Sequence, residues 1–254
     1  MTIVYIITAV LAAIILTTVG IHRYKVRHLI ERYEEADDEL SPLIACPPIS
    51  IVVVSQNEGR DMEENLPRLL RQRGIDLEVI VVNAASTDTT IDALKRLTIQ
   101  YPQLRQTYVP TSNANVNVQE AGCMLGARAA RNGWVLFVQP SFTPPSDIWV
   151  LDLLRYTSPT AKAVIDYGHT NFREDQKESN YKWKRRVKKM TQTVLHGRAI
   201  VTAEGSMLIR KDWLLNRAKN TDRGECVYVC RRFDPLQRVI LRVRNHRPDF
   251  SVLS

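Results

Sequence analysis

The chain has 254 residues, of which 44% are hydrophobic and 24% are charged, and its formal net charge at pH 7 is +8. This length accommodates one domain of moderate size and a small appendage. The sequence contains neither a low-complexity tract nor an internal repeat, which excludes fibrous, solenoid and largely disordered proteins.

The four cysteines are Cys46, Cys123, Cys226 and Cys230. Their spacing predicts neither a disulfide framework nor a zinc site, because the C-x3-C pair at 226–230 has no second pair of ligands. We therefore expect free thiols in a reducing compartment.

The N-terminal segment Ile3–Ile21 reads IVYIITAVLAAIILTTVGI and contains no charged residue. A membrane-spanning helix needs about 20 apolar residues, so the segment predicts a transmembrane anchor at residues 1–22. A cleaved signal peptide would have positive charge before its apolar core, and that charge is absent. Arg23, Lys25 and Arg27 follow the run instead, which predicts a single-pass protein of the inner (cytoplasmic) membrane with its C-terminal domain in the cytoplasm. A buried core helix is the alternative.

Residues 23–48 are predicted to connect this anchor to the rest of the chain. Tyr24–Leu40 is highly charged and suits a short helix close to the membrane. Ser41-Pro42 and Pro47-Pro48 then indicate a linker.

From residue 49 onward, strands and helices are predicted to alternate. The predicted strands are residues 49–54, 77–82, 104–109 and 134–138, and the predicted helices are residues 61–73, 91–97 and 121–131, with a further strand at 239–243. This order implies an α/β sandwich of three layers, in which helices cover both faces of a parallel sheet. Ligands of such sheets bind beyond the C-terminal ends of the strands, so the loops at 55–58, 83–86 and 139–141 form the expected site.

At these loops the chain resembles the family 2 glycosyltransferases, which have the GT-A fold. The resemblance is strongest over Pro47–Leu97, which runs through strand, loop, helix, strand and turn. A second match covers Gly126–Val150, where the family has a helix, a strand that ends in a D-x-D motif, and a Pro-rich loop. A weaker match covers Ala203–Lys211. The resemblance implies a nucleotide-diphospho-sugar transferase fold over residues 49–254.

The resemblance also implies a chemistry that several residues of this chain do not match. Family members transfer a sugar from a nucleotide-diphosphate sugar, with Mg²⁺ or Mn²⁺ held by the D-x-D acids. The D-x-D positions hold Gln139 and Ser141, and the position of the acid that contacts the nucleoside holds Ala84. Where relatives place a basic residue facing the donor, this chain has Gln119 and Glu120. A degenerate donor site is therefore predicted, with no metal ligand.

Six positions still match the family: Ser55, Asn57, Glu58, Asn83, Ser86 and Asp88. The predicted nucleotide-sugar-binding residues are Ser55, Asn57, Glu58, Asn83, Ala84, Ser86, Asp88, Gln139 and Ser141. Several of these side chains can also shape turns or cap helices. Glu225 is the candidate catalytic base and Asp222 is a second candidate, although either can be an ordinary surface carboxylate.

The basic segment Asn180–Leu195 places Trp183, Val187, Met190 and Val194 on one face of a predicted helix. It suits either an anionic membrane surface or a helix packed on the sheet. Nucleic acid is not an expected partner, because no recognition motif accompanies the charge. Three functions remain open. One is a membrane-anchored sugar transferase that acts on an envelope or lipid-linked glycan. Another is an inactive relative that binds or assembles with glycan-synthesis proteins. The third is a simple membrane-surface binding protein.

Overall fold

The computed structural model of the chain describes residues 2–33, 46–109, 118–167, 205–216, 224–231 and 238–246. The strands in these ranges are β1 (Ile30–Tyr33), β2 (Ile49–Ser55), β3 (Leu77–Asn83), β4 (Leu104–Tyr108), β5 (Trp134–Val138), β6 (Ala161–Tyr167), β7 (Gly205–Arg210), β8 (Gly224–Arg231) and β9 (Arg238–His246). The helices are α1 (Thr2–Leu29), α2 (Gly59–Leu70), α3 (Thr90–Gln100), α4 (Val118–Ala129), α5 (Trp149–Leu154) and α7 (Lys211–Leu215).

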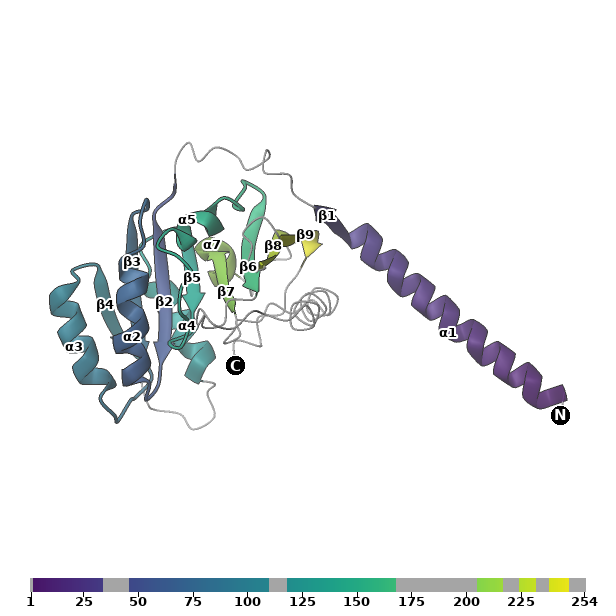
Figure 1. Cartoon of the computed structure of the whole chain (residues 1–254), viewed down its shortest axis with the longest axis horizontal. Helices are drawn as coiled ribbons and strands as arrows, with labels where there is room; N and C mark the ends of the chain where they lie inside the picture. The colour runs from purple at the N-terminus through teal and green to yellow at the C-terminus, as the bar shows by residue number, and fades with distance from the viewer. Residues whose placement is uncertain are drawn as a thin grey trace.

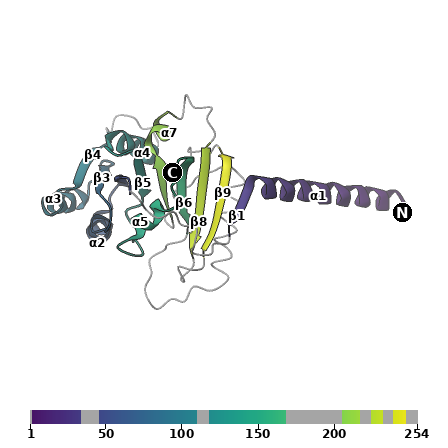
Figure 2. The same ribbon diagram turned by 90° about the horizontal axis from the view of Figure 1, so that it is seen from above.

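The described strands form one mixed sheet in the order β1-β9-β8-β6-β7-β5-β2-β3-β4. One apolar core, on the α4 and α7 side, contains Val52, Phe137 and Trp213. The other, on the α2, α3 and α5 side, contains Leu66 and Trp149. Figures 1 and 2 show helices on both sides of the sheet. The predicted three-layer arrangement is therefore confirmed.

The central strands are parallel, as the alternation of elements predicts. β2 pairs in parallel with β3 and β5, and β3 pairs in parallel with β4. Ser55 is opposite Asn83, and Val53 is opposite Val138. The loops after β2, β3 and β5 therefore meet at one edge of the sheet, which we call the carboxyl edge.

In the other half of the sheet, β7 runs opposite to the central strands. This strand is antiparallel to both β5 and β6, whereas β8 is parallel to β6. The C-terminal ends of β6 and β8 consequently lie at the carboxyl edge, while β8 begins at the opposite edge. The alternation of elements in the sequence did not predict β6, β7 or β8.

Helix α4 packs very closely on β2, because two glycines of α4 face the strand. A Cβ atom at Gly126 would lie 2.3 Å from Cγ1 of Val52, and one at Gly122 would lie 2.6 Å from Cγ1 of Val54. Any larger residue at these positions would push the helix away from the sheet.

Helix α1 extends away from the sheet (Figure 1) and exposes large apolar side chains such as Ile3, which is 73% exposed. No helix in the described part of the chain is both long and apolar enough to cross a membrane. This finding gives no support to the transmembrane anchor predicted at residues 1–22, which stays a prediction.

The connection between α1 and the domain differs from the predicted helix and linker. The helix ends at Leu29, and β1 then pairs antiparallel with β9, with Glu31 opposite Arg242. The predicted helix over Tyr24–Leu40 is wrong at residues 30–33, where the edge strand β9 satisfies the backbone groups of an extended segment. The sheet thus extends beyond the predicted domain boundary at residue 49. The linker at residues 34–45 lies outside the described residues, as does the predicted basic helix at residues 180–195.

The four cysteines are free thiols, as predicted, and Cys123, Cys226 and Cys230 are buried. Burial, with a smaller contribution from the nearby charge of Glu120, raises the pKa of the Cys123 thiol to about 12. This cysteine is therefore a neutral, apolar group at physiological pH.

Candidate functional site

Backbone and side-chain hydrogen bonds connect the loops that follow β2 and β3. The backbone N–H of Asn57 donates to Oγ of Ser86 over 3.0 Å, and Oδ1 of Asn57 accepts from the backbone N–H of Thr87 over 2.8 Å. The backbone N–H of Gly59 donates to Oδ2 of Asp88 over 3.2 Å. These bonds fix the position of one loop relative to the other, although some 30 residues separate them in the sequence.

The backbone conformation of these loops explains the residue types. Asn57 has a φ of 58°, in the left-handed region that asparagine tolerates better than most residues. Oδ1 of Asn83 accepts from the backbone N–H of Ser86 over 2.9 Å, and Oδ1 of Asp88 accepts from both the backbone N–H and the hydroxyl of Thr90. Asn57, Asn83, Ser86 and Asp88 therefore shape the two loops.

The third loop of the predicted site follows β5 and is held against α2. The backbone N–H of Phe142 donates to the carbonyl oxygen of Gln139 over 3.0 Å. The side chain of Asn65 donates to the carbonyl oxygen of Pro140 over 3.0 Å and accepts from the hydroxyl of Thr143 over 2.8 Å. Asn65 is not among the site residues predicted from the sequence. The sequence does give one indication of this role, because Asn65 is a polar residue on the apolar face of α2, among Met62, Leu66 and Leu69.

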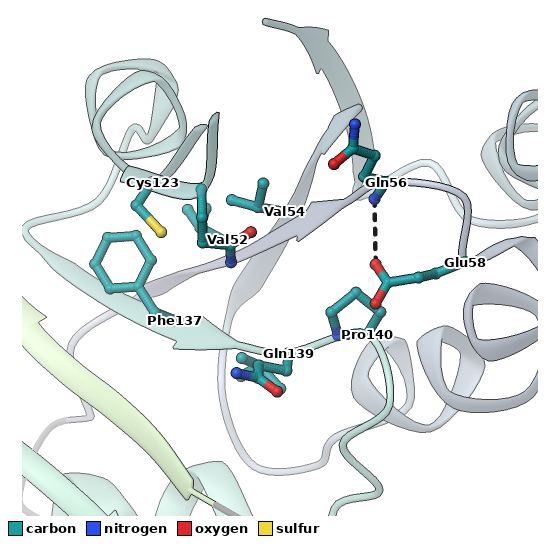
Figure 3. Close-up of a pocket in the computed structure, with 10 residues that line it drawn as sticks. Val52, Val54, Gln56, Glu58, Cys123, Phe137, Gln139 and Pro140 are labelled. Atoms are coloured by element: carbon teal, nitrogen blue, oxygen red, sulfur yellow. Dashed lines mark hydrogen bonds between the residues drawn. The ribbon is translucent and has the colours of Figure 1, made fainter. Parts of the chain in front are cut away.

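A cavity of about 340 Å³ opens at the carboxyl edge between α4 and the loops that follow β2 and β5. Figure 3 shows Val52, Val54, Cys123 and Phe137 on one side, and Gln56, Glu58, Gln139 and Pro140 beside them. The described residues that line it are Val52, Val54, Gln56, Glu58, Gln119, Cys123, Phe137, Val138, Gln139 and Pro140. The cavity thus combines an apolar wall with three amides and one carboxylate.

Glu58 provides the only acidic side chain among the described residues that line the cavity. Burial raises the pKa of Glu58, and the charges of Asp61 and Asp88 add to this effect. The backbone N–H of Gln56, which donates to Oε2 over 3.2 Å, and the hydroxyl of Ser55 oppose it without cancelling it. The site therefore disfavours negative charge.

Of the predicted nucleotide-sugar-binding residues, Glu58 and Gln139 line the cavity. Ser55 and Ala84 are buried at the ends of β2 and β3, and Ser141 is half-buried next to the cavity lining. Gln119, which occupies a position where relatives have a basic residue, lines the cavity as the resemblance implied. Gln56 and Cys123 are cavity residues that the sequence analysis did not select.

The structure places Glu225 far from this cavity. It is the second residue of β8 and pairs with Ala161 at the start of β6, so it lies at the edge of the sheet opposite the carboxyl edge. The hydroxyl of Thr160 donates to its Oε2 over 2.7 Å. Glu225 therefore does not line this cavity, because β8 runs parallel to the strands that carry it, and its role as catalytic base stays a prediction. Asp222 lies outside the described residues.

The described residues do not fit the divalent metal that the family resemblance implies. Mg²⁺ and Mn²⁺ are usually bound by carboxylate oxygens, yet Gln139 and Ser141 offer only an amide and a hydroxyl. Glu58 is the one carboxylate among the described residues that line the cavity, and its side chain already accepts a hydrogen bond within its own loop. In the described parts of the chain, no group of three or more His, Cys, Asp or Glu side chains could hold a metal ion.

Solved structures with a similar fold include a mannosyltransferase. The mannosyltransferase PcManGT from Pyrobaculum calidifontis, solved with GDP-Man and Mn²⁺, has 19% identity and a TM-score of 0.54, and the match covers 81% of this chain and 57% of that chain. TarS residues 1–349 from S. aureus with UDP-GlcNAc has 15% identity and a TM-score of 0.48, with coverage of 67% and 47%. Glucosyl-3-phosphoglycerate synthase from Mycobacterium tuberculosis with Mn²⁺, UDP and phosphoglyceric acid has 17% identity and a TM-score of 0.46, with coverage of 72% and 63%.

At these identities the similarity shows the fold alone, and this chain spans little more than half of the mannosyltransferase. A search of curated proteins found no match. The family model for glycosyl transferase family 2, in contrast, matches residues 50–216, which is more than half of the chain and includes every loop of the cavity. The fold is GT-A, as predicted, and the chain belongs to glycosyl transferase family 2.

Proposed function

We propose that the protein is a non-catalytic member of glycosyl transferase family 2 that uses its cavity to bind a ligand. One observation carries the proposal: β5 is followed by Gln139, Pro140 and Ser141 at the position of the family's metal-binding acids. A diphosphate leaving group develops negative charge that a metal ion or fixed positive groups must stabilise. The described residues that line the cavity provide neither a metal site nor a cationic side chain.

The absence of a positioned base in the described cavity lining supports the same proposal. Transfer to an acceptor hydroxyl needs a group within hydrogen-bond reach that takes its proton. Glu225 lies at the opposite edge of the sheet, and the carboxylate of Glu58 is turned toward the backbone of Gln56 (Figure 3). Neither carboxylate is placed for this task.

The competing function is a sugar transferase that works on an envelope or lipid-linked glycan acceptor. It is favoured by the cavity itself, which remains open at the edge where the family binds its donor. The similar mannosyltransferase was solved with GDP-Man, and TarS with UDP-GlcNAc. An active enzyme of this kind would bind a nucleotide sugar, and Mg²⁺ or Mn²⁺ would be its cofactor.

We also propose that α1 attaches the protein to the inner membrane, with the domain on the cytoplasmic side and a glycan-synthesis protein as its partner. The exposed apolar side chains of α1 and the basic residues Arg23, Lys25 and Arg27 support this location. Flotation with vesicles measures the attachment. Protease accessibility in sealed vesicles then distinguishes a helix that spans the bilayer from one that lies in a single leaflet.

The decisive experiment measures transfer and hydrolysis by the full chain, with a panel of nucleotide sugars and Mn²⁺ or Mg²⁺. We expect no turnover above the protein-free blank. Metal-dependent turnover by the wild-type protein would overturn the proposal.

The double variant Gln139→Asp with Ser141→Asp tests the physical reason. Both positions are half-buried, so the acids can reach solvent, and we expect metal-dependent UDP binding to appear. Gln139→Asn with Ser141→Thr is the neutral control. Ala84→Asp is unsuitable, because Ala84 is 1% exposed and a buried carboxylate would destabilise the fold.

A further inference from the structure

We infer that the cavity binds an uncharged ring rich in hydroxyl or amide groups, a nucleoside or a sugar, and that Glu58 excludes ligands that carry negative charge. The inference rests on the proposed function, because a tightly bound metal ion would reverse the charge of the site. It identifies the class of ligand that a non-catalytic cavity would take.

The charges of the described cavity lining favour an uncharged ligand. Glu58 is the one ionisable carboxylate among the described lining residues, and these residues include no lysine, arginine or histidine. A phosphate group beside Glu58 would meet a like charge without a compensating cation. At about 4 Å, in the intermediate dielectric near a protein surface, such a pair weakens binding by at least roughly tenfold.

The loop after β2 positions the Glu58 carboxylate at the cavity wall. Glu58 follows β2, and its Oε2 accepts from the backbone N–H of Gln56, so the loop holds the carboxylate at the cavity wall next to Pro140 (Figure 3). The backbone N–H of Glu58 donates to the hydroxyl of Thr90 over 3.1 Å, which ties this residue to the start of α3. The negative charge is therefore held by the scaffold and does not swing freely into solvent.

The glutamine amides of the cavity lining suit a polar, uncharged ligand. Gln56 follows β2, Gln119 is on α4 and Gln139 follows β5, so the amides come from three separate elements around the cavity. Each amide has two N–H donors and a carbonyl acceptor, which suits the mixed donors and acceptors of hydroxyl and amide groups. A carboxylate and amides around an apolar wall match a neutral polar ring far better than an anion.

The shape of the cavity agrees with this ligand class. A volume of about 340 Å³ is at the small end of ligand sites and suits one or two rings. Val54, Cys123 and Phe137 offer apolar surface for a ring face. The Cys123 thiol contributes no charge, because its pKa lies near 12.

The test titrates the full chain by calorimetry with uridine, N-acetylglucosamine and UDP, each in EDTA. We expect uridine or N-acetylglucosamine to bind at least roughly tenfold more tightly than UDP. The two neutral ligands distinguish a nucleoside site from a sugar site. Tighter binding of UDP than of uridine, or no binding of either neutral ligand, would overturn the inference.

Glu58→Gln isolates the charge while it keeps the shape of the side chain. We expect this variant to bind UDP roughly tenfold more tightly than the wild type does and to keep its affinity for the neutral ligand. Glu63→Gln, on the outer surface of α2, is the matched control and should change neither affinity. An unchanged ratio of UDP to uridine affinity in Glu58→Gln would contradict the role of Glu58.

The outcomes separate this inference from the proposed function. Metal-independent UDP binding without turnover would overturn the inference alone. UDP binding that requires Mn²⁺, together with sugar transfer, would overturn both. Thermal unfolding of each variant shows whether a lost affinity reflects a lost fold.

Discussion

Replacing Glu78 with glutamine should destabilise the protein strongly, because this carboxylate is a buried hydrogen-bond centre. Glu78 is 8% exposed and lies near the start of β3. Its Oε1 accepts from the hydroxyl of Ser50 and from the backbone N–H of Arg131, both over 2.7 Å. Its Oε2 accepts from Nη1 of Arg105 over 2.9 Å. Three segments of the chain therefore meet at one charge.

The magnitude follows from these three bonds. Glutamine keeps one carbonyl oxygen but replaces the other oxygen with an amide nitrogen that cannot accept from Arg105. Hydrogen bonds to charged groups contribute about 1.5–3 kcal/mol each, and the partly exposed Arg105 reduces its own share. We expect a loss of about 3 kcal/mol in the free energy of unfolding. For a chain of this size, that loss lowers Tm by roughly 6–12 °C.

The pH dependence gives a second test of the same carboxylate. Burial alone would raise the pKa of Glu78, but the hydrogen bonds from Arg131, Ser50 and Arg105, with the charge of Arg105, outweigh burial and hold the pKa below its ordinary value of 4.5. A depressed pKa contributes stability that is present above the unfolded value and is lost as pH falls through the folded value. The difference in Tm between the wild type and Glu78→Gln should therefore be largest near neutral pH and shrink below about pH 4.5.

Thermal unfolding followed by circular dichroism across this pH range measures both effects. Glu63→Gln is the control, because Glu63 is half-exposed on α2 and forms a surface ion pair with Arg96. A Glu78→Gln variant that loses no more stability than this control would refute the reasoning. A difference that stays constant down to pH 3 would refute the assignment to the charge.

Three further outcomes are expected. Gly126→Ala should lose about 1–3 kcal/mol in chemical denaturation, because its Cβ would lie 2.3 Å from a side chain of β2, whereas Gly133→Ala, with open space at its Cβ, is the control that should change little. Glu58→Gln should raise Tm at pH 7, because the raised pKa of Glu58 in the folded protein means that its ionised carboxylate destabilises the fold. This gain should vanish as pH falls below 4.5, and equal Tm values at pH 7 would contradict the expectation. Leu11→Lys with Ile14→Lys on the exposed surface of α1 should reduce flotation with vesicles, and unchanged flotation would count against attachment by α1.

Part of the fold could be predicted from local sequence because burial on both faces leaves a continuous apolar run. Residues 49–54 and 77–82 were predicted as strands on this basis, and both are fully or nearly fully buried. The order of strands and helices then predicted a parallel sheet and the edge at which its loops meet. The residue types at 139–141 also predicted, without any coordinates, that this edge lacks the family's acids.

The roles of individual site residues depended on contacts between distant segments. Asn57, Ser86 and Asp88 matched the family pattern, but only the structure shows that they bond one loop to the other. Ala84 stands where the family has a nucleoside-contacting acid, and its burial at the end of β3 excludes a charged replacement. Hydrogen bonds across 30 residues leave no periodic signal in a sequence.

Strand direction is the clearest property that tertiary structure alone decided. Glu225 follows the Ala203–Lys211 segment that resembles the family, yet β8 runs parallel to β6, so the start of β8 lies at the edge opposite the cavity. The pairing of β1 with β9 was equally hidden, because the 204 residues between Tyr33 and Arg238 separate two strands that meet at a sheet edge. Local composition determined which segments are buried, and the long-range pairing of strands determined which side chains share a site.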